Sequence, residues 1–242
     1  MKNWASFLTL IAIACTAYAA ADIAHETLGH GGACLLSGGR VVLVDTTFED
    51  CSVHSRWIDG AGPITGIVIA LVTWFAARRA SNQNLRVFLV LLFADAIFWN
   101  VGYAIKSGLF HTGDWHFLID GLEPAGIWHV ALAAAGLAFY IVAMRMLAHV
   151  WPRGNGMRSA AFAIVAFLAA AALSAAAGYL DPRGPHTLLT DALPSSLGAI
   201  GLPLVGLRQR TDVTVAPSPV WMAIGAISAV AFVAILGPGV RF

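Results

Sequence analysis

The sequence predicts an all-α polytopic membrane protein, with six or seven transmembrane helices and a short β-prone hairpin loop after the first helix. Of the 242 residues, 59% are hydrophobic and only 11% are charged, whereas soluble domains are about 45–50% apolar and about 25% charged. Apolar runs of about 20 residues recur along the chain, which is the length needed to cross about 30 Å of hydrocarbon. This composition excludes a soluble enzyme, and the net charge of +1 gives no sign of a nucleic-acid partner.

The first predicted span covers residues 4–30. Its first twenty residues resemble a signal peptide, because Lys2 precedes an apolar stretch and Ala17-Tyr18-Ala19 resembles a cleavage site. The apolar pattern nevertheless continues to Leu28. We therefore expect a retained transmembrane helix.

The remaining spans follow with short connections. They are expected at 61–80, 86–106, 124–147, 158–180 and 219–237. A weaker segment at 188–207 contains Pro194, Pro203 and several glycines, which favours a kinked span or a re-entrant segment. We expect one membrane domain over 1–242, with a functional core at about 15–130 and additional helices at 131–242.

Basic residues predict the orientation of the bundle. With seven spans and the N-terminus inside, nine Lys and Arg residues fall on the inner side and five on the outer side, as the positive-inside rule requires. The 31–60 and 107–123 loops then face outward. The first of these loops is expected to hold Cys34 and Cys51, and an oxidising exterior would allow them to pair; two free thiols fit the sequence as well.

Ionisable residues crowd the end of the first apolar helix, in the order Asp22-Ile23-Ala24-His25-Glu26-Thr27-Leu28-Gly29-His30. His-Glu followed by a second His is typical of zinc hydrolases, where the histidines bind the ion and the Glu is the general base. The usual histidine spacing is i and i+4, whereas here it is i and i+5. A solvated helix end is the alternative interpretation.

The extra residue matters because positions i and i+5 lie about 140° apart on an ideal helix. A one-residue π-bulge would return His25 and His30 to a common face, and Gly29 tolerates such a distortion well. Zinc peptidases of the dipeptidyl peptidase III type have a similar His-Glu-x-x-Gly-His helix. The spacing is therefore compatible with a zinc site.

The motifs that follow extend the pattern. Gly31-Gly32 and Ser37-Gly38-Gly39-Arg40-Val41 lead into a β-prone stretch through Val44, and the next span opens with Asp59-Gly60-Ala61-Gly62-Pro63. Over residues 15–130 this succession resembles the site-2-protease family of membrane zinc metallopeptidases, and most closely its shorter branch. The resemblance implies a zinc helix, a hairpin, and a second core helix with an Ala-Gly-Pro start.

The resemblance also implies that a later segment supplies an Asp as the third zinc ligand, after an Asn-containing stretch. Asp114 is the preferred candidate, and Asp120 is the alternative because Asp120-Gly121 resembles the pair in longer family members. His116 and Glu123 are weaker candidates. Asp114 could instead cap the next helix.

The predicted function is that of a zinc-dependent membrane metalloprotease. His25, His30 and Asp114 would bind Zn²⁺, and Glu26 would act as general base on zinc-bound water. By the resemblance, Asn100 would contact the substrate backbone. Asp22, one helical turn before Glu26, would either orient a ligand from behind or only cap polar surface. The partners would be membrane lipid and a peptide or membrane-protein substrate, in a bacterial inner (plasma) membrane.

Two other functions fit the sequence. The inserted residue in the histidine motif would suit an inactive relative that binds metal or acts as a scaffold. A small transporter is the other alternative, with Asp22, Glu26 and Asp95 along an ion path.

Overall fold

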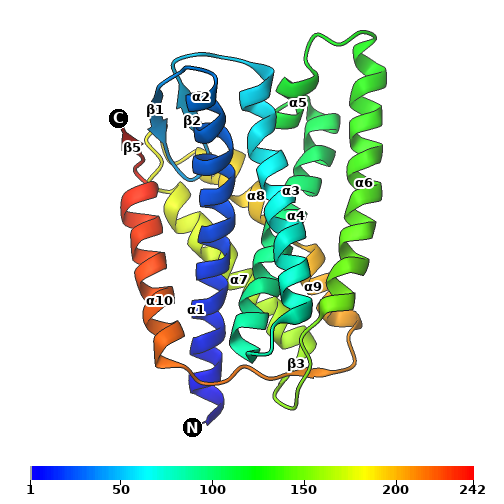
Figure 1. Ribbon diagram of the computed structural model, residues 1–242, viewed down its shortest axis with the longest axis vertical. Helices are drawn as coiled ribbons and strands as arrows, with labels where there is room; N and C mark the ends of the chain where they lie inside the picture. The colour runs from blue at the N-terminus through cyan, green and yellow to red at the C-terminus, as the bar shows by residue number, and fades with distance from the viewer. Residues whose placement is uncertain (1) are drawn as a thin grey trace.

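The computed structural model describes residues 2–242 as an up-and-down helical bundle (Figure 1). Seven helical segments within these residues are long and apolar enough to cross a membrane. They are Trp4–Leu36, Arg56–Arg79, Gln83–Phe110, Ala125–Val150, Ser159–Gly178, Leu188–Arg208 and Pro219–Leu236. Of the six or seven predicted spans, seven are therefore present by length and composition, and the weak sixth segment is one of them.

The first span consists of three consecutive helical pieces. These are α1 (Lys2–Ile23), the π-helix η1 (Ala24–Gly31) and α2 (Gly32–Leu36). The predicted end at residue 30 is wrong, because Gly31 and Gly32 keep helical dihedrals and carry the helix six residues further. It ends before Gly38, whose positive φ of 77° breaks the helix. Cys34 consequently lies in a helix and not in a loop.

The next two spans form a hairpin of helices with capped starts. In α3 (Arg56–Arg79) the Ser55 side chain accepts a hydrogen bond from the Ile58 amide, and in α4 (Gln83–Phe110) the Asn82 side chain does the same for the Leu85 amide. Such caps satisfy amide groups that would otherwise lack partners at a helix start. Both helices are longer than the predicted spans.

The later helices complete the bundle. They are α5 (Asp114–Ile119), α6 (Ala125–Val150), α7 (Ser159–Gly178), η2 (Leu188–Ala192), α8 (Leu193–Gly198), α9 (Gly201–Arg208), α10 (Pro219–Ala231) and η3 (Phe232–Leu236). The sixth span is broken between α8 and α9, as its composition led us to expect. Pro203 lies in the first turn of α9, where the missing amide proton costs no helical hydrogen bond.

Short antiparallel strands cap the bundle. The predicted hairpin is present as β1 (Val41–Val44) and β2 (Glu49–Cys51), and β5 (Val240–Arg241) extends the sheet in the order β2-β1-β5. β3 (Met157–Arg158) pairs with β4 (Asp212–Val213) at the other end of the bundle. The pairing of β5 with β1 was not predicted, because a two-residue strand gives no pattern in the sequence.

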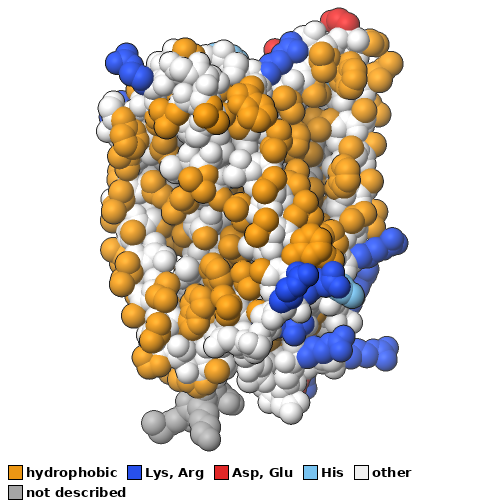
Figure 2. All heavy atoms as spheres, in the orientation of Figure 1, with side chains coloured by type: hydrophobic (Ala, Val, Ile, Leu, Met, Phe, Trp, Pro, Cys, Tyr) orange, Lys and Arg blue, Asp and Glu red, His pale blue; other side chains and the backbone are white. Residues whose placement is uncertain are grey.

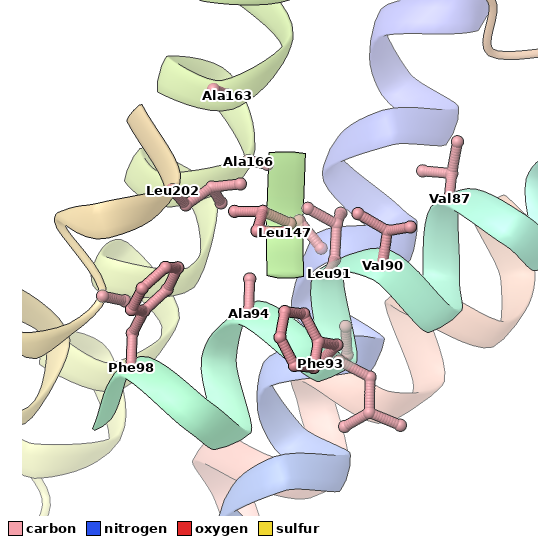
Figure 3. Packing of buried hydrophobic residues seen from close by; sticks show 14 of the residues in the cluster. Val87, Val90, Leu91, Phe93, Ala94, Phe98, Leu147, Ala163, Ala166 and Leu202 are labelled. Carbon is pink, nitrogen blue, oxygen red and sulfur yellow. The ribbon is translucent and has the colours of Figure 1, made fainter. Parts of the chain in front are cut away.

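The core of the bundle is built around α4. Figure 3 shows Leu91, Ala94 and Phe98 of this helix facing residues from α6, α7 and α9, among them Leu147 and Leu202. Its middle is buried on all sides, which explains why it lacks an amphipathic pattern. α4 therefore provides a fixed support for the groups near its upper end.

Apolar and basic side chains are distributed differently over the surface. Figure 2 shows apolar side chains along the length of the visible face, whereas Lys and Arg gather mostly towards the lower end. That end includes Arg78 and Arg79, in the last turn of α3. The β1–β2 hairpin and α5 lie at the opposite, upper end (Figure 1).

Candidate metal centre

The π-helix η1 brings the two histidines of the motif together. Nε2 of His25 and Nε2 of His30 lie 3.2 Å apart, with the rings edge to face. The predicted helix distortion is confirmed, because the wider turn absorbs the extra residue of the i, i+5 spacing. Both side chains are buried. Their ring nitrogens therefore converge in an interior site.

A carboxylate from a distant segment joins the histidines. Asp114 begins α5, and its Oδ2 lies 3.0 Å from Nε2 of His25 and 3.3 Å from Nε2 of His30. Gly113 turns the chain into position with a φ of 83°, where a side chain would also meet the Tyr103 hydroxyl. Asp120 is exposed at the far end of α5 and is not part of this group.

The charge of Asp114 suits a cation ligand. Burial raises the pKa of its carboxyl, but hydrogen bonds from His25 and His30 outweigh burial and hold the pKa below the usual range. The side chain is therefore an anion near neutral pH. His116 and Glu123, the weaker third-ligand candidates, lie outside this group.

The three donor atoms fit a tetrahedral metal ion. Ligands at about 2.0–2.1 Å from Zn²⁺ lie about 3.3 Å from one another in tetrahedral geometry. The three donor–donor distances here are 3.0, 3.2 and 3.3 Å. Two imidazoles and one carboxylate form a borderline donor set of the kind that binds zinc, and the fourth position is left for water or substrate.

The neighbouring helix fixes the ring of His30. Its Nδ1 donates to the carbonyl oxygen of Ile58 at 2.8 Å, so Nε2 is the nitrogen of this ring that can give a lone pair to a metal ion. Gly62 lies against this ring, and a Cβ on Gly29 would lie 2.5 Å from the Cα of Gly62. Small residues in both helices therefore allow α3 to approach closely, which explains the glycine-rich start of this helix.

Glu26 lies beside the histidines, with Oε1 3.9 Å from Nε2 of His25. Its side chain is only 6% exposed and contributes to the wall of a cavity of about 400 Å³. His25, His30 and Asp114 line the same cavity. A general base and three possible metal ligands thus face one shared space.

Several polar residues that the sequence analysis did not assign also line the cavity. They are Glu49, His54, Asp59, Tyr103, Lys106 and Arg183. They come from β2, α3, α4 and the connections, so only the tertiary structure brings them together. Of these residues, only Asp59 could have been found from the sequence, because it directly precedes the glycine-rich motif at the start of α3.

Asn100 and Asp22 are placed differently from the predicted roles. Asn100 donates to the Ala96 carbonyl at 2.7 Å and does not line the cavity, and its Oδ1 has no hydrogen-bond partner among the described residues. Contact with a substrate in the cavity is therefore not supported for Asn100. Asp22 is completely buried, and neither of its oxygens has a hydrogen-bond partner among the described residues. It therefore does not orient a histidine by hydrogen bonding.

A disulfide joins the metal-site helix to the hairpin. Cys34 in α2 and Cys51 in β2 are bonded, which decides between the two alternatives left open by the sequence. A Cβ on Gly39 would lie within 3.0 Å of both sulfur atoms, so the turn passes close to the bond. Because β2 lines the cavity, the bond holds one cavity wall against the helix.

Comparison with known proteins gives no family for this chain. No family model, no curated protein and no solved structure matches it. The resemblance to the site-2-protease family rests on the motif residues quoted above.

Proposed function

We propose that the protein is a membrane-embedded zinc metalloprotease. The observation that carries this proposal is the convergence of two imidazole nitrogens and one carboxylate oxygen beside Glu26 in one cavity. A chance cluster of surface groups would not bury both histidines and Glu26 inside an apolar bundle. The arrangement has the parts that metal-assisted hydrolysis needs.

The residues would act as follows. His25, His30 and Asp114 would hold Zn²⁺, which when bound supplies Lewis-acid chemistry that polarises a carbonyl group and makes water more acidic. Glu26 would accept the proton of the attacking water and pass it to the leaving amine. Trp99, stacked on His25 at 4.6 Å between ring centroids, would keep that imidazole in place.

The substrate class follows from the surroundings. Seven apolar helices support a multi-pass position in a membrane, and the cavity lies near one end of them, between the hairpin and α5. We infer that the substrate is a peptide segment in or next to the membrane. Its backbone must be locally unwound, because helical amides and carbonyls are otherwise bonded to one another.

The side of the membrane is inferred from two features. Basic side chains gather at the end opposite the cavity (Figure 2), which the positive-inside rule places in the cytoplasm. The Cys34–Cys51 bond lies at the cavity end, and disulfides persist in oxidising compartments. Both features support a cavity that opens towards the exterior face of a plasma membrane.

The test uses the full chain in detergent with a quenched fluorescent library of transmembrane peptides. The wild-type protein is expected to contain zinc and to cleave some members. Glu26→Gln should keep the metal and lose about 10²–10⁴-fold in rate, since general acid–base catalysis contributes about that much. Full activity in metal-loaded Glu26→Gln protein, or wild-type protein without bound metal after zinc is supplied, would contradict the proposal.

A further inference from the structure

Three histidines outside the cavity gather near the upper end of α4. His111 directly follows α4, His116 lies in α5, and His129 lies in the first turns of α6. Nδ1 of His116 is 3.0 Å from Nε2 of His129, and the ring of His111 stacks on that of His129 with centroids 3.9 Å apart. None of the three lines the cavity of the candidate metal centre.

The hydrogen bonding of His129 fixes its tautomer. Its Nδ1 lies 2.8 Å from the carbonyl oxygen of Ala125, and a carbonyl can only accept. Nδ1 therefore carries the proton, and the lone pair of Nε2 is directed at His116. The same construction is present in the first site, where Nδ1 of His30 donates to the Ile58 carbonyl. A backbone carbonyl behind the ring is the usual support of a metal-binding histidine.

The spacing of the nitrogen atoms is also that of metal ligands. Two imidazoles on one tetrahedral ion hold their donor atoms about 3.3 Å apart. His116 and His129, joined here by a hydrogen bond, have their nitrogens 3.0 Å apart and need move little to share an ion. His111 is exposed and stacks on the ring of His129, so its side chain is the candidate for a third nitrogen. Because His116 is only partly buried, an ion can enter from solvent.

We propose that His116, His129 and His111 form a second metal site, which binds a divalent transition ion that prefers imidazole, such as Zn²⁺, Ni²⁺ or Cu²⁺. Mg²⁺ and Ca²⁺ prefer oxygen ligands and are not expected there. A bound ion would join the end of α4, α5 and the start of α6. Since α5 begins with Asp114, occupancy of the second site would hold the element that presents this carboxylate. The proposal does not depend on the proposed protease activity.

The test measures zinc stoichiometry by mass spectrometry after equilibrium dialysis of tag-free, full-length protein in detergent. Wild type should bind two zinc ions per chain, and His116→Gln should bind one. A His25→Gln/His30→Gln double variant should keep the ion that His116→Gln loses. His186→Gln, a change of an exposed histidine elsewhere, serves as the matched control and should bind two.

The outcomes separate the two sites. If His116→Gln binds as many ions as wild type, or if the double variant binds none, the second site is refuted whatever happens to the first. The second site is supported if the double variant keeps one ion and the triple variant, which adds His116→Gln, loses it. This result stands even if wild type binds only that one ion, which would mean that the first site is empty.

A second variant covers the case in which His116→Gln does not fold. His111→Asn changes an exposed side chain, and asparagine accepts the left-handed backbone found there, with a φ of 56°. We expect at least about tenfold weaker binding of the second ion, by analogy with the loss of a supporting group, and an unchanged melting temperature. Unchanged affinity would remove His111 from the site and overturn the three-histidine proposal.

Discussion

Asp114 is the residue for which the structure adds most to the sequence. The sequence favoured Asp114 as the third ligand and kept Asp120, only six positions away, as the alternative. The choice depends on which end of α5 faces η1. Asp114 Oδ2 lies 3.0 Å from His25, whereas Asp120 is exposed at the other end of the helix.

This difference gives a matched pair of substitutions. Asp114→Asn removes the anionic ligand, so zinc affinity should fall by at least about tenfold, while Asp120→Asn should bind zinc as wild type does. Competition titration with a zinc-binding dye measures both. Weaker binding in the Asp120 variant, with normal binding in the Asp114 variant, would reverse our assignment.

Asp45 gives a pH prediction at a site outside the helices. Burial raises the pKa of its carboxyl to about 6, although the amide and hydroxyl of Thr47 donate to Oδ1. A raised carboxyl pKa in the folded state favours folding below the ordinary pKa near 3.8, and this stabilisation is lost as the pH rises through 6. Asn at this position imitates the protonated acid.

We therefore expect Asp45→Asn and wild type to melt at similar temperatures at pH 4, and the variant to melt higher at pH 7. Melting in detergent, followed by fluorescence across this range, measures the difference. A difference that is constant with pH, or that grows towards pH 4, would contradict the assigned pKa.

Among the elements, the packing of η1 against α3 determines the geometry of the candidate metal centre. The i, i+5 spacing of the two histidines predicts the distorted helix, and the conformational freedom of Gly29 is compatible with it. The structure adds a second reason, since Gly29 and Gly62 let two backbones approach closely. That contact depends on tertiary packing, which the sequence pattern alone could not reveal.

Gly62→Ala tests this contact. The added methyl group would collide with the ring of His30, whereas a methyl group on Gly32 would meet nothing within 4 Å. We expect Gly62→Ala to lose at least about tenfold in zinc affinity and Gly32→Ala to retain it. Equal affinities in the two variants, measured by the same dye competition, would show that α3 does not position His30.

The disulfide between α2 and β2 should stabilise the fold. Its cysteines are 17 positions apart, and closing a loop of about this length contributes about 3 kcal/mol in the chain-entropy model. Cys34→Ser/Cys51→Ser should therefore melt at a lower temperature than Cys15→Ser, which removes the free cysteine. Equal melting temperatures for the two variants would show that the bond adds no stability.

At the scale of the whole molecule, composition was enough to predict a bundle of apolar helices. Hydropathy located the spans because each must be apolar along about 20 residues, whatever its neighbours. Hydropathy could not predict which residues form the wall of the cavity. Tyr103, Arg183 and Glu49 reach it from separate elements, and their meeting depends on how helices and hairpin pack.

The most direct test of the central claim is an anomalous difference map at the zinc edge, from crystals of the zinc-loaded protein. The account predicts a peak about 2.0–2.2 Å from Nε2 of His25, Nε2 of His30 and a carboxylate oxygen of Asp114. No peak between these three side chains, with the two imidazole rings turned apart, would contradict it.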